Sequence, residues 1–309
     1  MLNCPILLFT FKRPEETKKI LKIILNQKPS KLYIFQDGPK ENFTQYDNLR
    51  YKKTRDLINS ISKRKKITKF FFKKNIGTTY IFDKVLRKIF KREKKLIILE
   101  DDTLPKKSFF RFCAKLLIKY KNNKKISSIS GCNLIDGTRK KNQISNKDSY
   151  FFSKYVQVWG WATWSDRWLG HYDISMKNWI KNKKKFMKLK SLNYGEKRHF
   201  KHYLSRFVER KEAWDLQWVY VNLLKKRLTI VPKKNLIKNI GFKSDPDGIG
   251  TKKFRNLYYS NIKFPLKHPN KVFQNLNYDN FLYNSFYNRE NILIRILKKL
   301  KKASIKIYN

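Results

Sequence analysis

The chain has 309 residues, of which 41% are hydrophobic and 15% aromatic, so it can bury a large core and is not an intrinsically disordered protein. Its 73 Lys and Arg outnumber 23 Asp and Glu and give a formal net charge of +50; 16 of the basic residues are Arg and therefore 57 are Lys. Because the Lys are spread evenly and accompanied by many Asn and Ile, A/T-rich codon usage explains this charge without a specific nucleic-acid partner, although weak attraction to anionic lipid, RNA or phosphorylated substrates follows from it.

The first third of the chain alternates strand and helix patterns. Continuous apolar runs that end at Gly, Pro, Asn or acidic residues predict strands at Pro5–Phe11, Lys31–Gln36, Ile67–Phe72 and Leu96–Leu99. Helices are predicted between them, at residues 14–27, where Pro14 precedes two acids, and at Tyr46–Ser62 and Thr78–Phe90. This repetition favours an α/β fold with a mostly parallel sheet buried by helices on both faces.

Polar residues follow each of the four predicted strands. Since ligands of parallel α/β sheets bind outside the carboxyl ends of the strands, we expect these residues to converge at one edge. They are Arg13, Asp37, Asn75 and the run Glu100-Asp101-Asp102.

The acidic run is the most distinctive local feature. Three adjacent carboxylates at the end of a buried strand repel one another and need a counter-charge. Mg²⁺ or Mn²⁺, which bridges protein carboxylates to a diphosphate, would supply it. The alternative is a solvated acidic turn that caps the following helix.

The second half is rich in tryptophan, and all seven Trp lie between Trp159 and Trp218. Its patterns predict strands at Tyr150–Val158 and Leu228–Val231, and helices at Thr163–Leu169, Ser175–Lys190, Glu196–Arg210 and Trp214–Lys226. Beyond Asn235 the chain is polar and Asn-rich, with a predicted turn at residues 245–248.

Two features of this half offer chemistry. Asp215 follows Trp214, so it is either a general base whose pKa is raised by aromatic walls or an N-cap of the next helix. Trp159, Gly160 and Trp161 offer flat rings around a residue that permits close approach, so they either stack on a sugar or pack in the core.

Two weaker features complete the sequence. Glu196, His199 and His202 lie about one helical turn apart and could bind a metal, although a surface position is the better interpretation. The tail from Arg289 to Tyr308 forms a predicted basic amphipathic helix, which either lies on an anionic membrane or packs on the domain. The three Cys have no CxxC spacing and predict neither a disulfide framework nor a zinc site, as in a reducing cytosol.

Six segments resemble, in their order, a GT-A glycosyltransferase of the bacterial type, similar to the N-acetylglucosaminyltransferase I family with its Glu-Asp-Asp form of the metal motif. They are PILLFTFKRPEET, YIFQDGPK, KNIG, LIILEDDTLPKKSFF, VQVWGWATW and EAWDLQW. The resemblance covers roughly residues 3–243 and implies a Rossmann-like, mixed and mostly parallel sheet. It implies a nucleotide-sugar-binding half (1–104), an acceptor and catalytic half (105–243) and a C-terminal extension (244–309).

The resemblance also assigns roles. In the donor site, Arg13 would contact the diphosphate, Asp37 the base (usually uracil) and Asn75 the nucleotide, while Glu100 and Asp101 would lie near the ribose and donor sugar. Asp102 would bind the Mn²⁺ or Mg²⁺, and Asp215 would be the inverting general base. The acceptor pocket would be shaped by Trp159, Gly160, Trp161 and Trp214. One departure is the lack of a His in residues 75–90, where animal enzymes place a base-contacting one.

The implied protein is a metal-dependent inverting glycosyltransferase. It would move a sugar from a UDP-sugar to a hydroxyl of a surface-glycan or lipid-linked acceptor, as in lipopolysaccharide or capsule synthesis. We expect it in the cytoplasm, or peripheral on the inner membrane through the basic tail. The alternatives are a retaining transferase or nucleotidyltransferase on the same fold, a basic nucleic-acid-binding protein, and a relative without turnover.

Overall fold

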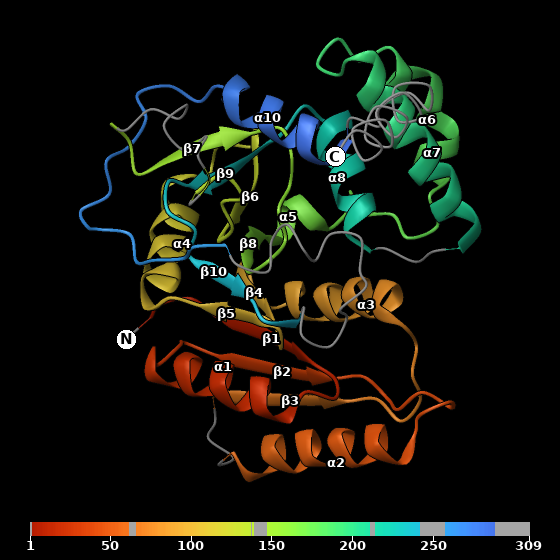
Figure 1. Cartoon of the computed structure of the whole chain (residues 1–309), viewed down its shortest axis with the longest axis vertical. Helices are drawn as coiled ribbons and strands as arrows, with labels where there is room; N and C mark the ends of the chain where they lie inside the picture. Colours follow the sequence, from red (N-terminus) through yellow and green to blue (C-terminus); the bar gives the residue numbers. More distant parts are fainter. Residues whose placement is uncertain are drawn as a thin grey trace, which may run out of the picture.

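The computed structural model describes residues 2–61, 66–136, 138, 147–210, 214–241 and 257–287 (Figure 1). Its centre is an eight-stranded sheet in the order β3-β2-β1-β4-β8-β6-β9-β7, beside a two-stranded sheet of β10 and β5. The strands are β1 (Ile6–Thr10), β2 (Leu32–Gln36), β3 (Ile67–Phe71), β4 (Lys95–Glu100), β5 (Thr103–Pro105), β6 (Ile126–Ser130), β7 (Tyr150–Ser153), β8 (Trp161–Trp164), β9 (Leu228–Pro232) and β10 (Ile237–Asn239).

Helices flank the large sheet (Figure 1). They are α1 (Pro14–Asn26), α2 (Gln45–Ser60), α3 (Thr78–Phe90), α4 (Lys107–Lys119), α5 (Ser165–Trp168), α6 (Lys177–Met187), α7 (Tyr194–Arg210), α8 (Trp214–Leu224) and α10 (Leu276–Leu282), followed by a π-helical turn η3 (Tyr283–Tyr287). The predicted α/β class, with a mixed and mostly parallel sheet between helices, is confirmed.

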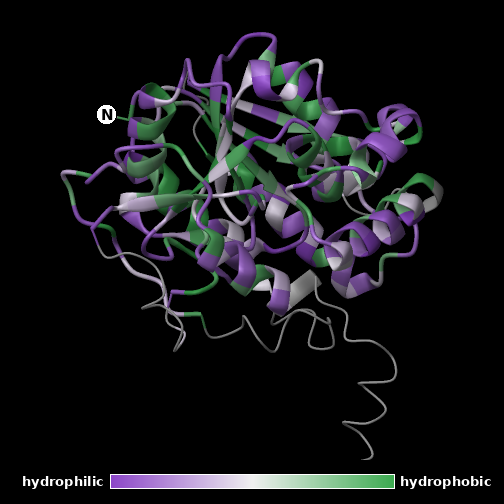
Figure 2. Cartoon of the chain, turned by 90° about the horizontal axis from the view of Figure 1, so that it is seen from above, coloured by the Kyte–Doolittle hydropathy of each residue, from purple (hydrophilic) through white to green (hydrophobic). Residues whose placement is uncertain are grey.

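The continuous apolar strands feed both faces of the sheet. Leu7 and Phe9 of β1 join the core under α3 and α8, whereas Ile6 and Leu8 join the core under α1 and α4. Because successive side chains of a strand point to opposite faces, an uninterrupted apolar run is what a strand covered on both sides requires. Figure 2 shows these apolar strands inside a polar shell of helices and loops.

The four N-terminal strands lie where the sequence predicts them, and the errors lie further along. The predicted strand Tyr150–Val158 ends at Ser153, and the predicted helix Thr163–Leu169 is instead β8 followed by the short α5. The sequence patterns also missed β5, β6, β8, β10 and α10. Ile126–Ser130 was overlooked because its serines break the apolar run, yet Ser127, Ser128 and Thr229 interact through their hydroxyls across β6 and β9.

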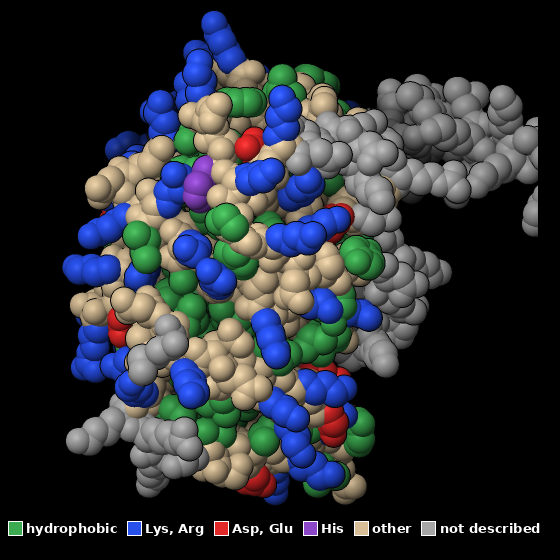
Figure 3. All heavy atoms as spheres, turned by 90° about the vertical axis from the view of Figure 1, so that its left-hand side faces the viewer, with side chains coloured by type: hydrophobic (Ala, Val, Ile, Leu, Met, Phe, Trp, Pro, Cys, Tyr) green, Lys and Arg blue, Asp and Glu red, His purple; other side chains and the backbone are tan. Residues whose placement is uncertain are grey.

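The turn at 245–248 and the tail from Arg289 to Tyr308 lie outside the described residues. Within the described part of the chain, no helix combines the length and apolarity needed to cross a bilayer. Figure 3 shows Lys and Arg side chains spread over one whole face, with few carboxylates between them.

Candidate functional site

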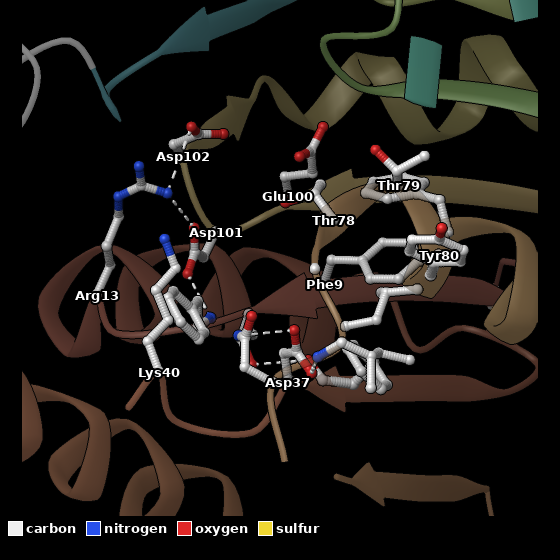
Figure 4. Close-up of a pocket in the computed structure, with 18 residues that line it drawn as sticks. Phe9, Arg13, Asp37, Lys40, Thr78, Thr79, Tyr80, Glu100, Asp101 and Asp102 are labelled. Carbon is white, nitrogen blue, oxygen red and sulfur yellow. Dashed lines mark hydrogen bonds and ion pairs between the residues drawn. The ribbon is translucent and has the colours of Figure 1, made fainter. Parts of the chain in front are cut away.

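A cavity of about 890 Å³ lies at the carboxyl ends of the parallel strands (Figure 4). The chain proceeds outward from β1 to β2 and β3 and then returns to place β4 on the other side of β1, so the strand order reverses between β1 and β4. Crevices at such reversals are where open α/β sheets bind ligands. The lining includes all six residues predicted for the nucleotide and metal: Arg13, Asp37, Asn75, Glu100, Asp101 and Asp102.

Asp101 anchors Arg13 across the reversal. One carboxylate oxygen accepts a hydrogen bond from the Arg13 guanidinium at 2.7 Å, and the other accepts one from the Phe11 backbone N–H at 2.8 Å. Burial raises the pKa of Asp101 to about 6, and the charge of Arg13 opposes that rise. Both oxygens are therefore engaged, and the role of Asp101 here is to hold a cation at the cavity wall.

Glu100 and Asp102 are engaged much less. Asp102 lies 3.4 Å from the Arg13 guanidinium, and its side chain is 20% exposed. The Glu100 carboxylate has no hydrogen bond or ion pair in the described part of the chain, and burial together with the charges of Asp102, Asp101 and Asp215 raises its pKa well above the ordinary value. Burial likewise raises the pKa of Asp102. Their lone pairs are thus left for a ligand.

The segment after β10 closes one side of this acidic cluster. The Ile240 N–H donates to the Asp102 carbonyl at 2.7 Å, and a Cβ at Gly241 would lie 2.5 Å from the Asp102 carboxylate. A larger residue at position 241 would therefore displace the Asp102 side chain.

Asp37 joins the ends of β2 and β3. Its carboxylate accepts hydrogen bonds from the Gly38 N–H at 2.8 Å and from the Asn75 amide at 2.9 Å. The Asn75 amide also donates to the Gly38 carbonyl at 2.9 Å, and a Cβ at Gly38 would lie 2.2 Å from the Lys74 backbone. Burial raises the pKa of Asp37 despite these bonds. Asp37 and Asn75 therefore hold each other at the floor of the cavity.

Several lining residues were not singled out from the sequence. Figure 4 shows Arg13 and Lys40 on one wall and Thr79 and Tyr80 on the opposite wall. Lys40 is exposed, and its charge opposes the rise that burial causes in the pKa of Asp37. Its position directly after the strand-ending Asp37-Gly38-Pro39 turn was the available signal.

Asp215 lies at the start of α8, in the first turn and not at the N-cap position before it. It is half-buried and is not among the described residues that line the cavity. Burial raises its pKa, while hydrogen bonds from its own backbone N–H and that of Leu216 oppose the rise. Since its charge raises the pKa of Glu100, the two carboxylates interact through space although they are far apart in sequence.

An aromatic column connects the cavity to α8. Phe9 and Phe82 line the cavity and stack with ring centroids 4.0 Å apart, and Phe82 stacks on Trp214 at 3.9 Å. Tyr172 then donates its hydroxyl to the Trp214 carbonyl at 3.0 Å. The residue that precedes Asp215 is therefore fixed on both sides.

The tryptophan segment is mostly core. Trp161 is 1% exposed, and its ring meets those of Trp168, Trp214 and Trp218. Gly160 has a φ of 59°, and a Cβ there would lie 2.5 Å from the Ile237 side chain. Trp159 alone among Trp159, Trp161 and Trp214 is only half-buried. Of the three, only Trp159 keeps part of its surface exposed for an acceptor, whereas Trp161 and Trp214 are buried.

The weak metal-site candidate on α7 includes Glu196, and this carboxylate forms an ion pair with Lys154. Glu196 is buried and its carboxylate lies 2.8 Å from the Lys154 ammonium, and it also accepts the Asn193 N–H at 2.8 Å. In the described part of the chain, no group of three or more His, Cys, Asp or Glu is arranged to hold a metal ion by itself.

The cavity nevertheless suits a divalent cation that is shared with a ligand. Its lining carries four carboxylates (Asp37, Glu100, Asp101 and Asp102) against two cations (Arg13 and Lys40). Mg²⁺ is commonly held by only one or two protein carboxylates, and substrate phosphates and water supply its other ligands. Asp102 and Glu100, the two carboxylates with free lone pairs, fit that arrangement.

No protein-family model matches the chain, and no curated protein matches it.

Proposed function

We propose that the chain is a GT-A, metal-dependent inverting glycosyltransferase that moves a sugar from a nucleoside-diphosphate sugar to an acceptor hydroxyl. The observation that carries this proposal is the cavity at the β1/β4 reversal, where two cations meet a cluster of under-compensated carboxylates, with a further carboxylate, that of Asp215, within electrostatic reach. Its volume of about 890 Å³ suits a ligand of nucleotide-sugar size. The acceptor class we favour is a bacterial surface glycan or its lipid-linked precursor.

The cations and the floor of the cavity give the donor its orientation. Arg13, held by Asp101, and Lys40 would contact the diphosphate, because both place positive charge on one wall. Asp37 and Asn75 offer a carboxylate and an amide at the floor, where a nucleotide base would bind. UDP is the donor nucleotide we favour.

Asp102 would hold the divalent cation, with Glu100 beside it. When bound, Mn²⁺ or Mg²⁺ would neutralise the charge that develops on the departing diphosphate. Burial is the first cause of the raised pKa of both carboxylates, and the charges of Asp102, Asp101 and Asp215 add to it at Glu100. A cation bound between them would offset this cost of burying negative charge, which supports a metal-dependent donor site.

Asp215 would be the general base. Its carboxylate takes the proton of the acceptor hydroxyl while the acceptor oxygen forms a bond to the anomeric carbon. The bond from that carbon to the diphosphate oxygen breaks, its electron pair leaves with the diphosphate, and the configuration inverts. If Asp215 served only to stabilise the first turn of α8, a retaining transferase or a nucleotidyltransferase on this fold would become the better proposal.

The test is thermal stabilisation of the purified protein by UDP-, GDP-, CMP- and dTDP-sugars, with and without Mn²⁺. A ligand at about 100 times its Kd adds roughly 2.7 kcal/mol to the free energy of unfolding, which a melting curve detects. We expect one nucleotide to raise the Tm only with Mn²⁺, the effect to vanish in Asp102→Ala and to persist in Glu41→Ala, which removes an exposed acid outside the cavity lining. No shift with any nucleotide in the presence of metal would refute the donor site.

A further inference from the structure

A second cavity, of about 540 Å³, lies between α2 and the end of β3, which is an edge strand of the large sheet. Its lining carries three cations, those of Lys52, Arg55 and Lys73, against the single acid Asp56. The cavity at the β1/β4 reversal has the opposite balance, with four carboxylates against two cations. In a chain of net charge +50 exposed lysines decide little, and the distinctive residue of this second cavity is Arg55.

The Arg55 guanidinium is held in one orientation by two buried side chains. Its Nε donates to the side-chain oxygen of Gln36, which is 0% exposed. Its Nη2 donates to the hydroxyl of the buried Tyr51 at 2.6 Å, and its Cζ lies 3.9 Å from the centre of the Phe71 ring. The guanidinium is therefore positioned before a ligand arrives, which reduces the entropy lost on binding.

The two acceptors of Arg55 are themselves fixed. The Gln36 amide nitrogen donates to the carbonyl of Phe11 at 2.8 Å and to that of Tyr51 at 3.2 Å, so the amide oxygen faces Arg55. The Tyr51 hydroxyl donates its one proton to the Asp37 carbonyl at 3.0 Å and can only accept from Arg55. One edge of the guanidinium is thus engaged by the fold.

The other edge of the guanidinium has no partner in the described part of the chain. A guanidinium has five N–H donors, and Nη1, which carries two of them, forms no hydrogen bond or ion pair with a described residue. Among the six described arginines that are not exposed, a carboxylate pairs with four: Arg13, Arg50, Arg87 and Arg167. The other two are Arg55 and Arg227, and Nη1 of Arg227 donates to a backbone carbonyl. Arg55 therefore combines a fixed orientation with an uncompensated charge at a cavity wall.

We infer that this second cavity binds a phosphate monoester, with the phosphate on the free edge of Arg55. The planar fork of an arginine matches two oxygens of a phosphate. The net charge of the lining is +2, which suits a phosphate monoester, with nearly two negative charges at neutral pH, better than a carboxylate with one. The volume is in the range of small-molecule sites, and the apolar residues Pro39 and Phe72 of the lining would contact the organic part. The inference does not rest on the proposed enzymatic function.

The two cavities adjoin at the turn after β2. Asp37 and Lys40 line the large cavity, whereas Pro39 between them lines the second one. A phosphate probe can therefore reach cations in both cavities, and the variants have to distinguish them.

The test is isothermal titration calorimetry of the full chain with phenyl phosphate, in EDTA and at physiological ionic strength. Arg55→Gln should weaken binding roughly tenfold to a hundredfold, because it removes charge-assisted hydrogen bonds to the phosphate. Arg111→Gln is the matched control, since Arg111 also lies over a ring, that of Phe264 at 4.3 Å, but is exposed and outside the lining. Arg13→Gln removes the guanidinium of the large cavity. Both of these variants should retain the affinity.

Two further comparisons keep the test decisive if Arg55→Gln melts early. Arg55→Lys keeps the charge but not the planar fork, so it should restore only part of the affinity. Lys52→Gln/Lys73→Gln changes two exposed residues of the lining and should weaken binding severalfold at an unchanged Tm. Lys18→Gln/Lys22→Gln, at two exposed positions of α1 outside the lining, should not.

Three results would overturn the proposal: no binding of phenyl phosphate, equal losses in Arg55→Gln and Arg111→Gln or in the two lysine pairs, and a loss confined to Arg13→Gln. Benzoate that binds as tightly as phenyl phosphate would overturn it in favour of a carboxylate site. The metal-dependent Tm shift by a nucleotide-sugar is a separate measurement, so failure here leaves the proposed reaction untouched.

Discussion

Two adjoining regions of the large sheet use their side chains in opposite ways. Around β1, β2 and β4 the strands end in polar residues that open into the cavity, and the carboxylates of Glu100 and Asp102 are left largely without partners. Around β8 and α8 the aromatic residues leave no open face, and Trp161 is enclosed by three other Trp rings. The cavity region has carboxylates that are available to a ligand. The region around β8 and α8 is packed, and this packing holds Trp214, the residue before Asp215.

The largest expected effect tests whether Asp215 belongs functionally with the cavity. Asp215→Asn should lower kcat by a hundredfold to ten-thousandfold, on the order of a general base's contribution, while the donor still raises the Tm. Asp136→Asn is the control, because Asp136 is equally an acid, is buried and does not line the cavity. Transfer at the wild-type rate in Asp215→Asn would remove the base from the mechanism.

The pH dependence follows from the same residue. Burial raises the pKa of Asp215, so its carboxylate takes up a proton at a higher pH than an ordinary Asp does. A base works only when unprotonated, so kcat should fall as the pH drops through that raised value. A profile that stays flat in this range would count against Asp215 as the proton acceptor.

The second prediction concerns the packed region. Trp161→Ala should lower the free energy of unfolding by about 3–5 kcal/mol, the usual loss when a large aromatic side chain is removed from a core. Trp159→Ala, at a half-buried position next to it in sequence, should lose much less stability. Urea unfolding of both variants measures the difference. Similar losses at both positions would mean that Trp159 is core as well and is not available to an acceptor.

The sequence was most informative where strands are parallel. β1, β2 and β4 are nearly unbroken apolar runs, and β3 is apolar apart from Thr68 and Lys69. The residues that follow parallel strands lie at the same edge of the sheet, so Arg13, Asp37 and Asn75 could be brought together without a structure. The tryptophan segment could not be interpreted in this way. Trp161 lies on an antiparallel strand inserted between β4 and β6, and no local pattern records which neighbours an inserted strand will find.

The proximity of Asp215 to Glu100 was beyond sequence reasoning for a related reason. It depends on the stacking of Phe82 on Trp214, a contact between α3 and α8 that is set by packing and not by spacing. Lys40, in contrast, was within reach, because it follows the turn that ends β2.

The third prediction compares the half-buried Glu100 with the buried Glu196. The pKa of Glu100 is higher in the folded chain than in the unfolded chain, so ionisation of this carboxyl favours unfolding. The destabilisation is complete above the folded pKa, shrinks as the pH falls between the two values and is absent below the unfolded pKa. Glu100→Gln should therefore raise stability at neutral pH by on the order of 1 kcal/mol and abolish the gain at acidic pH, while activity is lost. Glu196→Gln, which breaks the pair with Lys154, should instead destabilise. Thermal melts of both variants across the pH range measure these changes in stability. A loss of stability in Glu100→Gln at neutral pH would contradict the interpretation that the Glu100 carboxylate is uncompensated in the fold.

The smallest predicted effect concerns Tyr172, whose hydroxyl contacts the backbone next to Asp215. It tests whether the packed region around α8 contributes to the chemistry at the cavity. The Tyr172 ring stacks on Trp168 at 4.1 Å, and its hydroxyl donates to the carbonyl of Trp214, the residue before Asp215. Its surroundings are also tied to α3, because Arg87 pairs with Asp83 and donates to the Tyr172 carbonyl at 2.7 Å. If Tyr172 positions Asp215, its hydroxyl matters to the proton transfer and not merely to the fold.

Tyr172→Phe and Tyr220→Phe each remove one buried hydroxyl that donates to a backbone carbonyl, at 3.0 and 2.8 Å. Both should therefore lose a similar amount of stability, about 1 kcal/mol. Only Tyr172→Phe should also lower kcat several-fold and move the acidic limb of its pH profile, with the KM for the donor unchanged, since only that hydroxyl holds the backbone beside Asp215. Identical kinetic losses in both variants would mean that the packed region acts through overall stability alone, and that the cavity and α8 are neighbours without a shared function.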